Sequence, residues 1–148
     1  MNHHSSKASL FLMELIIAIL VFSLSSAICV RFFAKAHLLT EDTQNLNHAI
    51  SLAESAAEVF YGVDGKLTDM RSILDSEQTG ILSDSDLLLF YNSSFSLCEK
   101  TEADYQMKIS LSHDKNMQIA DIRVINIAQD SKMIYQLNVK RYQGGDDL

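Results

Sequence analysis

An unbroken apolar stretch near the start of the chain constrains its fold more than any other feature. From Leu10 to Val30 every residue is apolar except three serines and one carboxylate, Glu14. At a helical rise of 1.5 Å per residue this run is about 31 Å long, close to the roughly 30 Å hydrocarbon core of a bilayer. The run contains neither Pro nor Gly, and Arg31 follows it directly. This pattern predicts a membrane-spanning helix.

Glu14 is the exception within the apolar run. A carboxylate near the centre of a bilayer costs on the order of 2.5–3.5 kcal/mol, so it needs a partner or a change of protonation. Ionisable residues inside membrane spans usually have a function. The alternative is an interfacial carboxylate, because Glu14 lies about one helical turn inside the run and its side chain can extend toward the headgroups. We favour a functional role.

A short polar leader precedes the run, and it ends in Lys7 followed by two small residues, Ala8 and Ser9. This leader, the apolar helix and Glu14 together resemble the N-terminal segment of type IV pilins and pseudopilins. In that family a basic leader ends in Gly, the chain is cut after it, and a Glu stands fifth in the mature chain. Aligning that Glu with Glu14 places the cut between Ser9 and Leu10. Ser9 therefore stands where the family has Gly, and Leu10 where Phe is usual.

The resemblance implies a structural subunit, a pseudopilin or minor pilin, that is made in a fixed order. A prepilin peptidase cuts after Ser9 and methylates the new amine of Leu10. The precursor lies in the lipid of the cytoplasmic membrane as a single-pass protein, with its N-terminus in the cytoplasm and its C-terminal domain outside. An inner-membrane assembly platform then adds it to other pilin-like subunits in an extracytoplasmic or cell-surface filament. There, Glu14 pairs with the amine of a neighbouring subunit's Leu10.

Two other N-terminal signals fit part of the same segment. Lys7 and the small residues around Ala27 are typical of a signal peptide, which would release a soluble domain after Ala27. Glu14, however, would interrupt its apolar core. Cys29 suggests a lipoprotein signal, but the preceding Ile28 is branched where a small residue is required. Both signals match less well than the pilin pattern.

An unprocessed single-pass protein with an extracytoplasmic binding domain is the remaining alternative. Arg31 and Lys35 follow the span, whereas only Lys7 precedes it closely. The excess of cations on the cytoplasmic side of a span, which usually sets orientation, therefore does not by itself place the N-terminus in the cytoplasm.

The helical pattern continues beyond the apolar run as one amphipathic stripe. No Pro or Gly occurs before Gly62, so a single helix of about 50 residues and about 75 Å is expected from Leu10 onward. We divide the chain into a leader (1–9), a transmembrane half (10–33) and an amphipathic half (34–61) of the long helix, and a C-terminal region (62–148). The apolar residues of the stripe recur at spacings of three, four and seven: Leu38, Leu39, Leu46, Ala49, Ile50, Ala53, Ala56, Ala57 and Phe60.

The C-terminal region changes from helical to strand periodicity. Gly62 and Gly65 predict a turn, residues 67–74 a short helix, and residues 75–85 a polar loop. Apolar residues then form a short run at 87–91 and alternate with polar ones in three later segments, 105–111, 120–124 and 135–139. The short connections between those three segments predict an antiparallel meander.

An antiparallel sheet with one apolar face needs a cover, and the alanine-rich stripe of the long helix provides it. The fold class expected is therefore α+β: a long N-terminal helix, half membrane-spanning and half amphipathic, packed on a small antiparallel sheet. This order is also what the pilin resemblance implies.

The composition argues against several other functions. The chain has 148 residues with 12 Lys and Arg against 19 Asp and Glu, and its net charge of −7 disfavours nucleic-acid binding. Phosphate-binding glycine loops, paired cysteines at zinc spacing and nucleophile elbows do not occur in the sequence, so we expect neither an enzyme nor a cofactor. Cys29 and Cys98 are expected to be free, buried thiols.

Three pairs of possible metal ligands are better explained as solvated side chains. His37 and His48 lie on the predicted helix without an acidic or cysteine ligand at fixed spacing. Calcium needs six or more oxygen ligands, and the sequence offers only the pair Asp84 and Asp86 and the pair Asp146 and Asp147. No metal site is expected.

Overall fold

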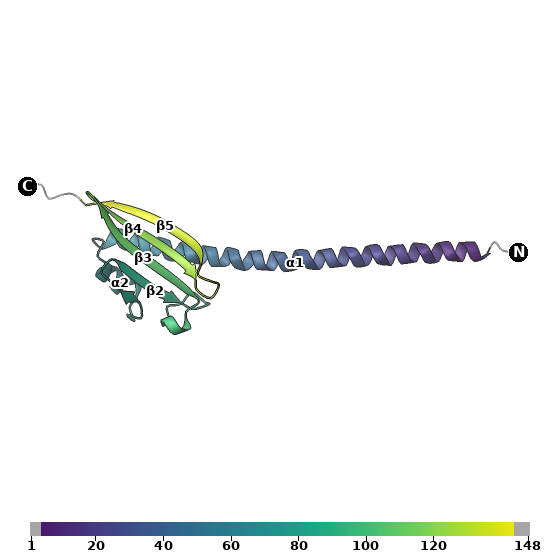
Figure 1. The fold of residues 1–148 in the computed structure, drawn as a ribbon, viewed down its shortest axis with the longest axis horizontal. Helices are drawn as coiled ribbons and strands as arrows, with labels where there is room; N and C mark the ends of the chain where they lie inside the picture. The colour runs from purple at the N-terminus through teal and green to yellow at the C-terminus, as the bar shows by residue number, and fades with distance from the viewer. Residues whose placement is uncertain (1–3, 144–148) are drawn as a thin grey trace, which may run out of the picture. The chain divides into compact units, whose positions relative to one another are not determined.

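The computed structural model describes residues 4–143, with side chains from residue 8 onward (Figure 1). The chain forms two compact units, Met1–Thr43 and Gln44–Leu148. Helix α1 (His4–Gly62) supplies the first unit and begins the second. The other elements are α2 (Leu67–Leu74), β1 (Ile81–Leu82), β2 (Asp86–Tyr91), the 3₁₀ helix η1 (Lys100–Glu102), β3 (Tyr105–Asp114), β4 (Met117–Asn126) and β5 (Lys132–Tyr142).

Helix α1 begins earlier than the predicted span and ends where the glycines indicate. It starts at His4, inside the predicted leader, because no residue between His4 and Leu10 breaks a helix. It ends at Gly62, and Gly65 follows with a φ of 63°. A left-handed residue just after a helix is a common way to redirect the chain, and Gly adopts this conformation without strain. The predicted turn and the predicted α2 are both confirmed.

The strands form one antiparallel meander. Among the described residues, five strands lie in the order β1-β2-β3-β4-β5, so each strand pairs with its neighbour in sequence. The three predicted alternating strands are confirmed as β3, β4 and β5, and the predicted run at 87–91 is β2. The prediction of a loop throughout 75–85 is wrong in one place, because Ile81 and Leu82 form β1 opposite Leu88 and Leu87. A tight turn, in which Ser83 donates from its backbone N–H to the Asp86 carbonyl oxygen at 2.8 Å, allows this short hairpin.

The second half of α1 covers the apolar face of the sheet. Four alanines and a phenylalanine of the predicted stripe are buried: Ala49, Ala53, Ala56, Ala57 and Phe60. They pack with buried side chains from β2, β3 and β4, among them Leu89, Met107, Ile109, Ile122 and Val124. At the end of α1, the Tyr61 hydroxyl donates to the Lys140 carbonyl oxygen of β5 at 3.1 Å. The small alanine side chains let the helix backbone approach the sheet closely.

The stripe is shorter than the sequence predicts. Leu38 and Leu39 are 65% and 67% exposed, and Leu46 is 38% exposed. Their spacing continues the apolar pattern, but periodicity specifies a helix face and not what lies against it. Of the three larger residues expected to contact the sheet beside the alanines, Phe60 is buried and Ile50 is half-buried, whereas the expectation is wrong for the exposed Leu46.

Candidate functional site

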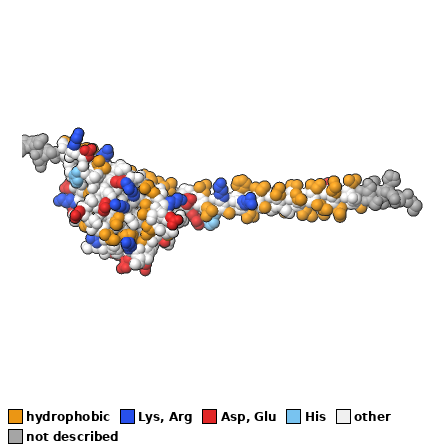
Figure 2. All heavy atoms as spheres, in the orientation of Figure 1, with side chains coloured by type: hydrophobic (Ala, Val, Ile, Leu, Met, Phe, Trp, Pro, Cys, Tyr) orange, Lys and Arg blue, Asp and Glu red, His pale blue; other side chains and the backbone are white. Residues whose placement is uncertain are grey.

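The apolar run lies on a helix with no part of the described chain covering it. Every residue from 8 to 43 is exposed, including large side chains such as Phe11 at 67% and Phe22 at 75%. Apolar side chains follow one another along this part of α1 in Figure 2. The helix is long and apolar enough to cross a membrane. A surface as long as the apolar run and without charged side chains other than Glu14 is unfavourable in water. The apolar run therefore needs an apolar environment.

Two of the three serines of the run, Ser25 and Ser26, have their hydroxyl groups satisfied within the helix. Ser25 donates to the Val21 carbonyl oxygen and Ser26 to that of Phe22, each at 2.9 Å. Polar groups in hydrocarbon need such internal partners because no water is present. These two serines are thus compatible with a membrane span.

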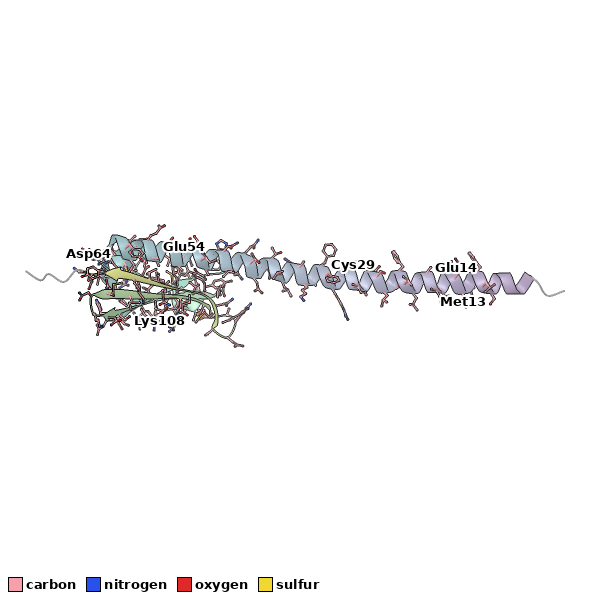
Figure 3. All side chains as sticks on the ribbon, turned by 90° about the horizontal axis from the view of Figure 1, so that it is seen from above. Met13, Glu14, Cys29, Glu54, Asp64 and Lys108 are labelled. Atoms are coloured by element: carbon pink, nitrogen blue, oxygen red, sulfur yellow. The ribbon has the colours of Figure 1, made fainter. Side chains whose placement is uncertain are left out.

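Glu14 has no such internal partner. Its side chain extends from α1 in Figure 3 and is exposed. No hydrogen bond or ion pair joins it to any other residue in the described part of the chain. The positions one turn away, Leu10 and Ala18, carry no charge, and Arg31 lies about 25 Å further along the helix axis. Among the described side chains, the Glu14 carboxylate therefore has no partner.

The predicted cleavage site lies on the same helix. Ser9 and Leu10 are both helical and exposed, and Leu10 is one turn from Glu14. A peptidase that cuts between them has to unwind this turn locally, since the peptide bond of a regular helix is enclosed by its own hydrogen bonds. The new amine would start the helix about 6 Å along the axis from Glu14.

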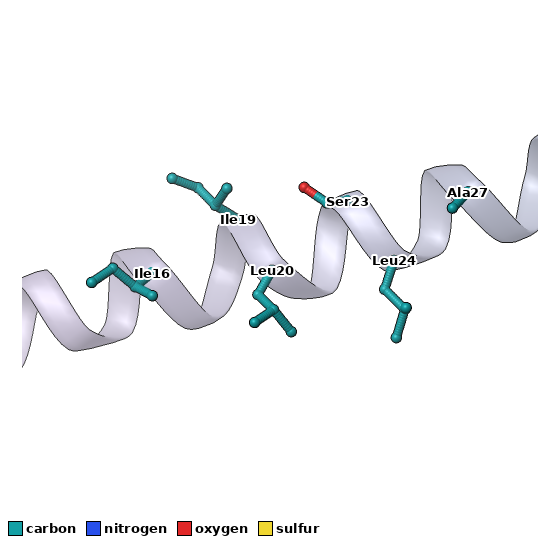
Figure 4. Close-up of a pocket in the computed structure, with 6 residues that line it drawn as sticks. All are labelled: Ile16, Ile19, Leu20, Ser23, Leu24 and Ala27. Atoms are coloured by element: carbon teal, nitrogen blue, oxygen red, sulfur yellow. The ribbon is translucent and has the colours of Figure 1, made fainter.

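A shallow apolar concavity follows one side of the helix after Glu14 (Figure 4). Its lining residues are Ile16, Ile19, Leu20, Ser23, Leu24 and Ala27. The two small residues, Ser23 and Ala27, are one turn apart, and small residues at this spacing let membrane helices pack closely. Sequence reasoning missed this feature, although the small-x-x-x-small spacing is visible in the sequence.

The two histidines that were considered as metal ligands contact different residues. His37 lies 3.9 Å from the Glu41 carboxylate. The His48 ring stacks on Phe95 with centroids 4.7 Å apart, and Phe95 stacks on Tyr105 at 4.2 Å. No group of three or more metal-ligating side chains occurs among the residues that the structure describes.

The two members of the acidic pair Asp84 and Asp86 have different surroundings. Asp86 accepts a hydrogen bond from Ser110 at 2.6 Å and lies 3.1 Å from the Lys108 ammonium, whereas Asp84 is exposed. The Ser110 hydrogen bond, and then Lys108, hold the pKa of Asp86 below its ordinary value. Asp146 and Asp147 lie outside the described residues.

The cysteines are unpaired, as predicted, but neither is fully buried. Cys29 is exposed on the apolar run, and Cys98 is half-buried in the connection after β2. Partial burial raises the pKa of the Cys98 thiol most, and the negative charges of Glu102 and Asp104 raise it further. This thiol is therefore a poor nucleophile at neutral pH.

No protein-family model, curated protein or solved structure matches this chain. A long N-terminal helix packed on a small antiparallel sheet is consistent with a pilin-like fold.

Proposed function

We propose that this protein is a pilin-like structural subunit, a pseudopilin or minor pilin, that is anchored in the cytoplasmic membrane and then assembled through helix α1. A prepilin peptidase is its processing enzyme, with the cut between Ser9 and Leu10 and methylation of Leu10. Its partners are other pilin-like subunits and an inner-membrane assembly platform. The proposed orientation has the N-terminus in the cytoplasm and the sheet outside.

The observation that carries this proposal is the unpartnered Glu14 one turn from the expected new N-terminus. In hydrocarbon, an isolated carboxylate is strongly unfavourable. When helices pack side by side, the amine on Leu10 of one subunit can lie beside Glu14 of the next and neutralise it. Because a buried charge without its partner is penalised strongly, the pair would also fix the axial offset between neighbouring helices.

Two features of the same helix support assembly by helix packing. Ser23 and Ala27 form a small-residue face on which a second helix can approach closely. The helix also lacks Pro and Gly from His4 to Tyr61, so it presents one continuous surface to its neighbours. Apolar side chains that contact lipid before assembly would contact neighbouring helices afterwards.

The mature N-terminus distinguishes this proposal from its alternatives. We expect mass spectrometry of the protein, expressed with a prepilin peptidase, to find a methylated Leu10. An intact Met1 would instead support an unprocessed membrane protein, and a chain that starts at Ile28 would support an exported soluble domain. Either of these results contradicts the proposal.

The role of Glu14 is tested by assembly of processed protein. We expect Glu14→Leu to insert into the membrane and to be cut normally, because neither step needs the charge. Its incorporation into filaments, or its cross-linking to partner subunits, should fall at least about tenfold. Glu14→Gln should be impaired as well, since it keeps the shape but loses the charge. Glu41→Leu, on the same helix beyond the apolar run, is the matched control. Normal assembly of processed Glu14→Leu would refute the pairing.

A further inference from the structure

The helix surface directly after the apolar run carries two cations and two aromatic rings. We call Arg31, Phe32, Phe33 and Lys35 the boundary turn. All four residues are exposed, and the two rings are 69% and 79% exposed. The boundary turn follows the last residue of the run without an intervening polar segment.

The two cations of the boundary turn have no protein partner in the described chain. Neither Arg31 nor Lys35 makes a hydrogen bond or ion pair with another described residue. The nearest carboxylates further along the helix are Glu41 and Asp42, but a helical ion pair needs a spacing of three or four residues. Lys35 is six residues from Glu41, and Glu41 already lies 3.9 Å from His37.

The depth of the boundary turn follows from the length of the run. If Leu10 lies at one edge of the hydrocarbon core, about 31 Å of helix places Arg31 at the other edge. Lys35 is one turn further, about 6 Å, which is the level of the phosphate groups. Two cations one turn apart at this depth face the same layer of lipid headgroups.

We propose that Arg31 and Lys35 bind the phosphates of anionic phospholipids at the boundary where the helix leaves the membrane. The Arg31 guanidinium offers a planar fork of donors that matches phosphate oxygens, and the Lys35 ammonium offers a compact charge beside it. The rings of Phe32 and Phe33 then enter the adjacent acyl chains. This inference rests on the membrane-spanning part of the proposed function and is independent of cleavage and assembly.

The two ends of the span would differ in their basic side chains after the proposed cleavage. The other nearby cation, Lys7, belongs to the segment that cleavage after Ser9 would remove. After cleavage, only the boundary turn keeps basic side chains at the edge of the apolar run.

The natural lack of tryptophan allows a direct test in the full-length chain. Ala34→Trp places a single tryptophan among the residues of the boundary turn, at an exposed position three residues from Arg31 and therefore close to it on the helix surface. The protein is reconstituted in phosphatidylcholine bilayers that contain an equal fraction of either brominated phosphatidylglycerol or brominated phosphatidylcholine, both of which quench tryptophan on contact. We expect phosphatidylglycerol to be preferred about fivefold for each cation at low salt, and less at high salt.

Charge variants in the Ala34→Trp background decide the origin of the preference. Arg31→Gln with Lys35→Gln should abolish it, whereas the exchange Arg31→Lys with Lys35→Arg should keep it. Glu41→Gln is the matched control and should not reduce it. Equal quenching by the two lipids, or a preference that survives the double glutamine change, would overturn the proposal. So would extraction of the chain by alkaline carbonate, since it would show that no span is inserted.

A competing partner is the acidic pair Glu41 and Asp42 of a second copy. In that case the double glutamine change would weaken self-association of the chain in the bilayer and leave the lipid preference unchanged, and the proposal would be wrong. A negative result in these bilayers leaves the assembly role of Glu14 untouched, because no peptidase or partner subunit takes part.

Discussion

The side-chain amide of Gln118 donates a hydrogen bond to the Gly65 carbonyl oxygen over 2.7 Å, which joins strand β4 to the turn after helix α1. Gln118 is only 3% exposed, and its own carbonyl oxygen accepts from the Gln143 amide at 3.2 Å. A buried amide is costly when unpaired, so both ends of this side chain are satisfied. The turn is thereby fixed from the sheet side as well as by its own backbone.

Gly65→Ala should destabilise the domain by about 2 kcal/mol or more. Its φ of 63° disfavours a side chain, and a Cβ there would collide with the Gln118 amide. Gly62→Ala is the matched control, because a Cβ at Gly62 meets no atom within 4 Å. It should stay within about 1 kcal/mol of wild type. Urea unfolding measures both, and equal effects of the two changes would contradict the structure.

A fragment of residues 35–148 should be soluble and folded, with helix and strand signals in circular dichroism. It retains the alanine stripe and the whole described sheet but lacks the apolar run. Ala53→Arg should unfold it or cost about 3 kcal/mol or more, because Ala53 is fully buried against the sheet. Glu54→Arg, one residue along on the exposed face, should change stability little. A soluble fragment without strand signal would disprove the architecture.

The hydrogen-bonded Asp86 should make stability depend on acid pH. Its pKa is lower in the folded protein than its ordinary value of 3.8. The carboxylate therefore stabilises the fold above that ordinary value, and the contribution is lost as the pH falls through the folded pKa. We expect Asp86→Asn to lower the unfolding free energy at pH 7 by about 1 kcal/mol or less, since the ion pair is partly exposed.

The difference between wild type and Asp86→Asn should shrink as the pH is lowered below about 4. Urea titrations at neutral and acid pH measure it. Asp84→Asn is the control and should cost less at neutral pH, because Asp84 makes no ion pair with a described residue. A difference that grows on acidification would contradict the assigned role.

Replacement of Ser9 tests the processing site. Ser9→Leu should block removal of the leader by a prepilin peptidase, because the site requires a small residue, whereas Ser9→Gly should preserve or speed it. Ser25→Leu is the discriminating control, since it would block a signal peptidase that cuts after Ala27 but leave the cut at Ser9 intact. Gel mobility and the mass of the N-terminal peptide report both. Cleavage of Ser9→Leu at the wild-type rate would show that the assigned site is wrong.

The periodicity of the chain predicts most of the fold. The alternation in 105–111, 120–124 and 135–139 identifies three strands because each has one buried face, and Gly62 with Gly65 marks the end of α1. β1 escapes prediction because two residues are too few to show a period. The buried position of Asp75, before β1, could not be predicted from a sequence pattern either. Its carboxylate accepts hydrogen bonds from the backbone N–H groups of Thr79 and Gly80 at 3.1 and 2.7 Å.

The candidate site is predictable to a lesser degree. The apolar run and the position of Glu14 are visible in the sequence, since hydropathy and charge are local properties. The absence of a partner for Glu14 in the described helix had to come from the structure. Phe95 illustrates the opposite limit: it lies in a polar loop with a φ of 56°, and no local pattern indicates that it stacks between His48 and Tyr105.

The nearest-neighbour order of the strands has a consequence for how the domain forms as the chain is delivered from its N-terminus. Each new strand from β2 to β5 finds its pairing edge on the strand that has just preceded it. The sheet can thus grow vectorially, one hairpin at a time, with small loop-closure costs at each step. The contact of Tyr61 with Lys140 joins distant parts of the sequence, so this closure waits until β5 has emerged.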